Sequence, residues 1–167
     1  YVVERATGKP VAVNPFVEVN WASGWDFQKN RPIWTDVTTK ALAGEKVKVY
    51  PPNYGGTNWF PASFSPMTGL AYVNTFNIGV EYEPLPADSV KNLMEGDRSG
   101  GVTVKQTPIY PDPDPRGYLK AIDPMTGQAK WQTGFKSPNY SGTLVTAGGL
   151  VFTGELTGEF IAVDAES

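Results

Sequence analysis

The side chains that could carry chemistry in this chain are carboxylates, amides, lysines and tyrosines, because its 167 residues include no His and no Cys. This composition excludes Ser-His-Asp and Cys-His catalysis, zinc sites built on His and Cys ligands, and disulfides. Asp112 and Asp114 flank Pro113 as a potential carboxylate pair, but calcium sites draw about six to eight oxygens from a wider pattern. A solvated loop is therefore the favoured interpretation, and we expect any reaction to need a bound ion or an organic cofactor.

Two further candidate sites receive little support from the residues around them. The glycine-rich run at 96–101 has neither the Lys-Ser/Thr pair nor the following helix of a phosphate-binding loop. Trp21, Trp25 and Trp34 lie close together in sequence and could stack on a sugar, but packing in a core or loop is the favoured interpretation.

The overall composition indicates a packed protein made of many short strands. Hydrophobic residues make up 40% of the chain and aromatic residues 13%, which predicts an ordered core. The 18 glycines and 15 prolines interrupt the chain too often for long helices. The net charge is −3 with no basic stripe, so we expect no nucleic-acid partner.

One strand–turn–strand pattern recurs along the chain and is clearest at 118–131. Asp123 can accept hydrogen bonds from the turn, Pro124 fixes its own φ, and Gly127 can adopt the left-handed conformation that closes the hairpin. Related turns occur around Gly8, Gly69 and Asp164. The spacing from the Asp123 turn to the Asp164 turn is about 40 residues, within the ~40–50-residue period of a propeller blade.

The pattern of apolar residues predicts strands at 143–146, 150–153 and 159–164. Residues 87–96 are the only stretch that favours a helical turn or two. Residues 110–116 contain three prolines and predict an extended loop.

Residues 1–167 are therefore expected to form part of a single β-propeller domain, with about three to four repeat units and both ends truncated. A partial ring exposes sheet edges and the apolar faces of its blades. The remaining blades of the same propeller are accordingly expected as partners.

Several motifs follow one another in an order that points to a known family. They are Thr7-Gly8-Lys9, Val19-Asn20-Trp21-Ala22-Ser23-Gly24, Gly55-Gly56-Thr57-Asn58-Trp59, Ser65-Pro66-Met67-Thr68-Gly69, the run from Gly117 to Trp131, and Thr146-Ala147-Gly148-Gly149-Leu150-Val151-Phe152-Thr153-Gly154. Together they resemble the C-terminal part of the propeller in methanol/ethanol-type alcohol dehydrogenases that depend on pyrroloquinoline quinone (PQQ).

The resemblance implies an all-β fold, a fragment of an eight-bladed β-propeller with four-stranded antiparallel blades. It implies that Ala121 and Trp131 dock neighbouring blades against each other. The implied activity is oxidation of alcohols to aldehydes in the periplasm, with PQQ beside Ca²⁺ or a lanthanide ion and a cytochrome c as electron acceptor. The ion ligands and the catalytic Asp of this family belong to earlier blades, so this chain alone is expected to contain no catalytic and no metal-binding residue.

Three residues correspond to positions near the cofactor of this family. Asn58 matches an asparagine that contacts the quinone, and its amide can both donate and accept hydrogen bonds. The alternative is that Asn58 only satisfies the hydrogen bonds of its own turn. Trp59 either lines the alcohol pocket or belongs to the blade core. Tyr140 stands where methanol dehydrogenases resembling this chain carry a Trp close to the cofactor, which favours a broader alcohol dehydrogenase or an uncharacterised relative over one specific for methanol. The alternative is an ordinary tyrosine at the end of a strand.

Two other functions remain open from the sequence. The first is a non-catalytic β-propeller scaffold with quinoprotein-like repeats, against which the Asn58-Trp59 segment argues. The second is a carbohydrate-binding β-sandwich, suggested by the aromatic content alone. Assembly of the whole protein as a homodimer is one further expectation.

Overall fold

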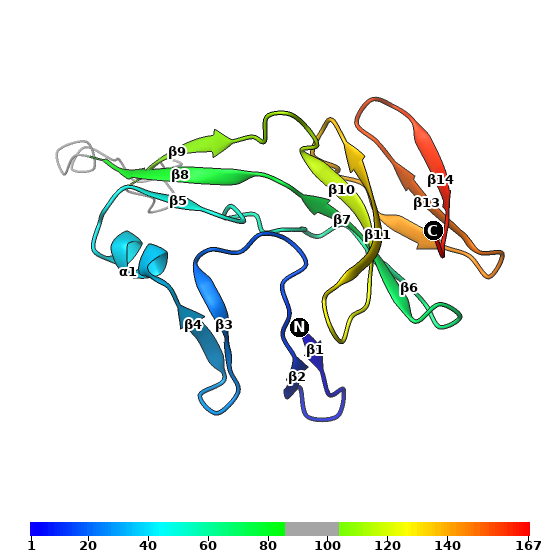
Figure 1. The fold of residues 1–167 in the computed structure, drawn as a ribbon, viewed down its shortest axis with the longest axis horizontal. Coiled ribbons are helices and arrows are strands. Elements are labelled where there is room, and N and C mark those ends of the chain that lie inside the picture. The colour runs from blue at the N-terminus through cyan, green and yellow to red at the C-terminus, as the bar shows by residue number, and fades with distance from the viewer. Residues whose placement is uncertain (86–103) are drawn as a thin grey trace, which may run out of the picture.

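The computed structural model describes residues 1–85 and 104–167, and almost all of its regular structure is strand (Figure 1). The strands are β1 (Val2–Val3), β2 (Pro10–Ala12), β3 (Ala22–Asp26), β4 (Arg31–Trp34), β5 (Val47–Val49), β6 (Ser63–Ser65), β7 (Leu70–Phe76), β8 (Gly79–Pro84), β9 (Val104–Ile109), β10 (Gly117–Ile122), β11 (Ala129–Phe135), β12 (Thr143–Val145), β13 (Leu150–Gly154) and β14 (Phe160–Asp164). The helix is α1 (Asp36–Leu42). The helical segment predicted at 87–96 and the glycine run at 96–101 lie outside the described residues.

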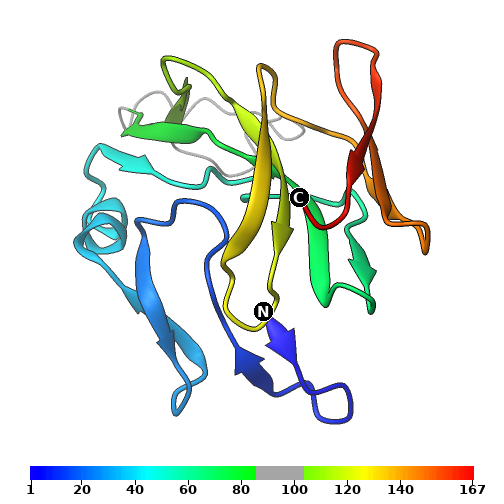
Figure 2. The ribbon, with the colours of Figure 1, turned by 45° about the vertical axis from the view of Figure 1, so that its right-hand side comes forward.

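A four-stranded antiparallel sheet in the order β11-β10-β7-β6 is the central unit of the fold. The three-stranded sheet β12-β13-β14 lies next to it (Figures 1 and 2). The hairpins β1-β2 and β3-β4 form two small sheets on the other side, and β5 pairs with the β8-β9 hairpin in a further sheet. Because β8 and β9 lie between β7 and β10 in the chain, their hairpin is an excursion from the central sheet.

The turn predicted between β10 and β11 has the expected hydrogen bonds. The Met125 amide donates to Asp123 Oδ1 at 2.8 Å, and the Gly127 amide donates to the Asp123 carbonyl at 2.8 Å. Gly127 has a φ of 74°, in the left-handed region that glycine adopts without strain. The predicted turn chemistry is therefore confirmed.

The hydrophobic core lies between the central sheet and the β12-β13-β14 sheet. Tyr72, Leu119 and Val151 from these two sheets have 0% exposed surface. The Trp131 indole Nε1 donates to the Ala165 carbonyl at 3.1 Å, and the Tyr72 hydroxyl donates to the same carbonyl at 2.9 Å. Trp131 thus links adjacent sheets, which is the role expected for it.

Ala121 lies on the neighbouring strand, directly opposite Trp131, with no exposed surface. A larger side chain at this position would push the indole away from the adjacent sheet, because a packed core has little free volume.

The strands predicted between 143 and 164 are confirmed within a residue or two, and residues 110–116 contain no strand before Gly117. The helix α1 was not predicted. Its sequence has adjacent β-branched residues, Thr38 and Thr39, which are weak helix formers. The Thr38 hydroxyl donates to the Trp21 carbonyl at 2.6 Å, so a contact distant in sequence holds this helix in place.

Within residues 1–85 and 104–167, no helix combines the length and the apolar character needed to cross a membrane.

Candidate functional site

Asn58 lies in the loop between β5 and β6, where its amide already makes two local hydrogen bonds. Its Nδ2 donates to the Tyr54 carbonyl at 2.9 Å, and its Oδ1 accepts from the Trp59 amide at 2.8 Å. A side-chain amide has two N–H donors and two oxygen lone pairs. One donor and one acceptor site therefore remain for a ligand, and the side chain is exposed.

Trp59 is 83% exposed, so within the described residues its indole is not part of a blade core. One side of the indole rests on Phe60, with the ring centroids 4.9 Å apart and the planes tilted by 37°. The rest of the ring presents a large flat apolar surface to solvent.

Tyr140 lies in the connection between β11 and β12 and is 46% exposed. Its ring is perpendicular to Phe60 at 5.5 Å between centroids and lies 5.1 Å from Phe76. Phe60 and Phe76 therefore bring the Asn58-Trp59 loop and Tyr140 together, although these two predicted sites are far apart in the chain. We call Tyr54, Trp59, Phe60, Phe76 and Tyr140 the aromatic cluster.

A backbone contact fixes the loop of the aromatic cluster to the central sheet. The Phe76 amide at the end of β7 donates to the Gly56 carbonyl at 2.8 Å. A Cβ on Gly56 would lie 2.3 Å from Val17 Cγ2, so any larger residue would displace the Val17 side chain or the loop itself. Tyr54, in the same loop, packs edge-on against Phe76 at 5.6 Å.

Phe60 and Phe76 were not identified from the sequence as site residues. The adjacent aromatic pair Trp59-Phe60 was a local signal that could have indicated the first of them. Phe76 could not be identified from the sequence, because its place beside the Asn58-Trp59 loop depends on how the end of β7 meets that loop.

Burial raises the pKa of Tyr54 to about 12, and the neighbouring hydroxyls of Tyr140, Tyr110 and Tyr82 add to this effect. The neutral phenol is thus favoured in the folded protein relative to the unfolded chain, where a tyrosine titrates at a pKa of about 10.

We expect the stability contributed by Tyr54 to be complete below pH ~10 and to be lost as the pH rises toward ~12, because the unfolded chain releases this proton first. Chemical unfolding of the full-length protein at a series of alkaline pH values measures this loss. Tyr54→Phe should reduce the alkaline loss of stability, and an identical alkaline profile in this variant would contradict the assignment.

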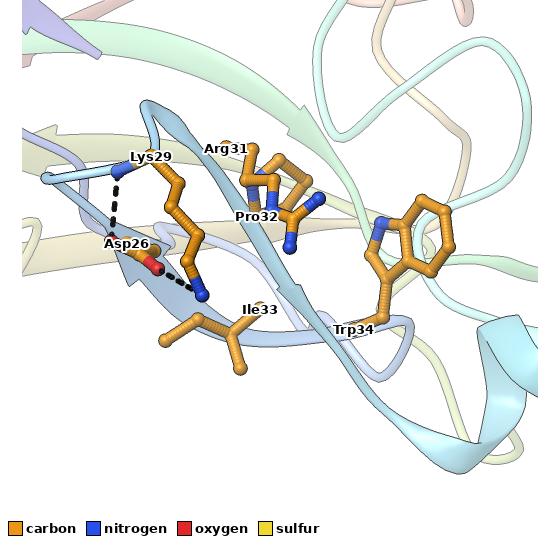
Figure 3. Close-up of a pocket in the computed structure, with 6 residues that line it drawn as sticks. All are labelled: Asp26, Lys29, Arg31, Pro32, Ile33 and Trp34. Atoms are coloured by element: carbon orange, nitrogen blue, oxygen red, sulfur yellow. Dashed lines mark hydrogen bonds and ion pairs between the residues drawn. The ribbon is translucent and has the colours of Figure 1, made fainter.

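Two hollows lie on the N-terminal part of the chain, and the larger reaches Gly56 in the loop of the aromatic cluster. The larger, of about 400 Å³, is mainly apolar and is bordered by Trp21, Trp25 and Pro51. The smaller, of about 270 Å³, lies on the β3-β4 hairpin beside Trp34, which is 59% exposed rather than packed (Figure 3).

At the smaller hollow, Asp26 forms an ion pair with Lys29 at 3.6 Å and accepts a hydrogen bond from the Lys29 amide at 3.0 Å (Figure 3). The Gln28 amide donates to the same oxygen at 3.0 Å. The Lys29 amide is the main cause of the lowered pKa of Asp26. The Asp26 carboxylate thus makes its hydrogen bonds and its ion pair within its own turn, so it is a poor candidate for binding a ligand. Neither hollow contains Asn58, Trp59 or Tyr140.

The exposed part of the aromatic cluster fits a planar aromatic ligand better than a metal ion. Trp59 and Tyr140 expose ring surface, and planar ligands are commonly held by such side chains together with a few polar groups. Asn58 supplies the adjacent amide. Among the residues the structure describes, no group of three or more His, Cys, Asp or Glu side chains is placed to hold a metal ion.

Comparison with known proteins identifies relatives along the whole chain, although no family model matches it. The chain is 37% identical to a quinoprotein ethanol dehydrogenase of Pseudomonas putida, matching 100% of this chain and 27% of that protein. It is 33% identical to a lanthanide-dependent methanol dehydrogenase of Methylacidiphilum fumariolicum, with the same coverage of both. It is 34% identical to a 1-butanol dehydrogenase (cytochrome c) of Thauera butanivorans over 99% of this chain and 24% of that protein.

Solved structures similar to this chain are also alcohol dehydrogenases. A quinohemoprotein alcohol dehydrogenase from Pseudomonas putida HK5 superposes with a TM-score of 0.81 at 29% identity, covering 99% of this chain and 25% of that one. A europium-containing methanol dehydrogenase gives a TM-score of 0.79 at 31% identity, with 99% and 28% coverage. These matches confirm the predicted propeller fragment, and the β-sandwich alternative is wrong. The chain spans about a quarter of the length of the relatives it matches.

Proposed function

Because this chain belongs to the family of quinoprotein alcohol dehydrogenases, we propose that the whole protein oxidises an alcohol to an aldehyde with PQQ. The observation within the structure that carries this proposal is the aromatic cluster, which joins Asn58 and Trp59 to Tyr140 through Phe60. Since the chain spans only about a quarter of its relatives, the catalytic base and the ion ligands are assigned to other blades.

In this proposal the chain supplies one side of the cofactor site. Trp59 and Tyr140 would contact the edge or face of the planar quinone, and Asn58 would use its remaining N–H and lone pair toward the polar groups of the quinone. When bound, PQQ supplies the redox chemistry by accepting two electrons, while a Ca²⁺ or lanthanide ion polarises it. The residues of this chain hold the cofactor in place and exclude water from its ring.

We further propose that the substrate range is broader than methanol and that a cytochrome c accepts the electrons in the periplasm. The phenol of Tyr140, in place of the Trp of methanol dehydrogenases, supports the first part. The second is supported by a relative that is itself named for cytochrome c. A homodimer remains a further proposal for the whole protein.

The scaffold alternative receives no support from the relatives. The proteins reported above that match the full length of this chain are all named dehydrogenases.

The proposal is tested with the full-length protein reconstituted with PQQ and either Ca²⁺ or La³⁺. We expect the absorption spectrum of a bound quinone and reduction of an artificial electron acceptor when ethanol is added. A folded full-length protein that neither binds the quinone nor oxidises any of a series of primary alcohols would contradict the proposal.

Replacement of Trp59 by alanine should weaken PQQ binding about two- to tenfold, because an aromatic contact contributes about 0.5–1.5 kcal/mol. Within this chain the indole is exposed and packs on Phe60, so the variant should still fold, which thermal unfolding of the apo protein checks. Equilibrium titration of the apo protein with PQQ measures the affinity. Trp34→Ala is the matched control, an exposed tryptophan on β4 outside the aromatic cluster, and an equal loss of affinity in both variants would show that the effect of Trp59 is not local.

A further inference from the structure

Buried polar side chains hold the segment that carries Tyr140, although residues 136–142 contain no strand. The Ser141 amide donates to Asn139 Oδ1 at 2.9 Å, and Asn139 is 1% exposed. The Ser141 hydroxyl accepts from the Gly154 amide at 3.0 Å. The backbone on the C-terminal side of Tyr140 is thus fixed by side-chain contacts and not by a strand ladder.

Asn74 reaches this segment from the central sheet. It lies on β7, is 3% exposed, and donates from Nδ2 to the Ser141 carbonyl at 2.7 Å and to Thr153 Oγ1 at 2.7 Å. Thr153, on β13 of the adjacent sheet, donates in turn to the Gly142 carbonyl at 3.0 Å. A single amide therefore ties β7 to the Tyr140 segment and to the next sheet.

The two parts of the Asn74 amide contribute differently. Its Oδ1 is buried and has no hydrogen-bond partner among the described residues, which destabilises the folded state. The two bonds from Nδ2 offset that cost and satisfy the acceptors on Ser141 and Thr153, which an apolar side chain of similar size would leave without this donor. The value of asparagine at this position thus lies in the two acceptors that its Nδ2 reaches.

We propose that Asn74 is a positioning residue for the quinone site. By fixing the carbonyl of Ser141 it sets the direction of the preceding residue, Tyr140, whose ring packs on Phe60 and Phe76. This inference rests on the proposed function, because it requires Tyr140 to contact the cofactor.

The test is a double-mutant cycle in the full-length protein, with Asn74→Leu and Tyr140→Ala measured alone and together. Asn74→Leu should weaken PQQ affinity and lower kcat/KM about tenfold, because small displacements of a positioned group are costly. In the Tyr140→Ala background the same substitution should have almost no further effect, since residues that act through one another are not additive. The absorption spectrum of the bound quinone should also shift in Asn74→Leu, which a loss of stability alone does not produce.

Two further variants keep the test decisive. Asn14→Leu is the matched control, because it removes a comparable bond from Nδ2 to the Met125 carbonyl at 2.6 Å, away from Tyr140, and should leave PQQ affinity unchanged. If Asn74→Leu does not fold, Thr153→Val removes one of the two acceptors of Asn74 and should show a smaller loss with the same dependence on Tyr140.

The possible failures are distinguishable. Additive effects of Asn74→Leu and Tyr140→Ala overturn the positioning role, as does a Tyr140→Ala variant with unchanged PQQ affinity. An unsubstituted full-length protein that binds no quinone contradicts the proposed function itself, and the inference falls with it.

Discussion

Replacement of Tyr72 by alanine is expected to lower the free energy of unfolding by about 3–5 kcal/mol, the range for removing a large buried aromatic side chain. Tyr72 has no exposed surface, and its ring lies 6.0 Å from Trp131 in the core between the two sheets. Its hydroxyl donates to the Ala165 carbonyl, so the substitution removes both packing and a bond between sheets. Denaturant unfolding of the full-length protein measures the change.

Two variants separate the causes of this effect. Tyr72→Phe keeps the ring but removes the hydroxyl bonds to the Ala165 carbonyl and to Thr68 Oγ1, so it should lose about 1–3 kcal/mol, the usual net contribution of two hydrogen bonds. Tyr110→Ala is the matched control, because this tyrosine is exposed and contacts Arg116 through its ring face. If Tyr110→Ala and Tyr72→Ala destabilise the protein equally, the core assigned to the sheet interface is incorrect.

Replacement of Gly117 by alanine should destabilise the protein by about 1–3 kcal/mol, the usual cost of overpacking. A Cβ at this position would lie 2.9 Å from the Thr75 carbonyl oxygen and 3.2 Å from both the Asn139 amide nitrogen and the Ser137 carbonyl oxygen. All three atoms belong to the backbone and cannot rotate away. Because two of them are in the connection that leads to Tyr140, PQQ affinity should fall together with stability.

The control for this prediction is Gly148→Ala, in a turn where a Cβ would meet only the Thr146 hydroxyl, at 3.7 Å. It should leave both PQQ affinity and the free energy of unfolding within about 0.5 kcal/mol of the original protein. Unchanged stability in Gly117→Ala would mean that the connection before Tyr140 has more room than the structure shows.

The parts of the fold that the sequence predicted are those whose conformation depends on residues close together in the chain. The turn at Asp123 and Gly127 depends on side-chain acceptors and on one left-handed residue, and both can be read locally. The strands between 143 and 164 alternate with clear turns. In contrast, α1 is held by Thr38 through the distant Trp21 carbonyl, and the pairing of β5 with β8 joins segments far apart in the chain. The strand pairing leaves no local signal, whereas α1 has local signals that were missed: Asp36 in its first turn, Lys40 in its last turn and Gly44 with a φ of 78° after its end.

The candidate site likewise has residues that short motifs indicated and residues that only the tertiary structure brings in. Asn58, Trp59 and Tyr140 were proposed from a resemblance in short motifs, and their contact with a cofactor stays a prediction. The structure adds that Phe60 and Phe76 join them, which depends on how the end of β7 meets two loops. The sequence left open whether Trp59 is core or surface, because adjacent residues in an irregular loop have no periodicity to indicate a buried side.

The carbonyl of Ala165 accepts bonds from Tyr72 and Trp131, which lie on different strands of the central sheet. A carbonyl oxygen has two lone pairs, and both are engaged here. A force that separates the two sheets would therefore act on two strands of the central sheet through one acceptor. Displacement of the Ala165 carbonyl would weaken both bonds, so the position of this one residue affects how both strands contact the adjacent sheet.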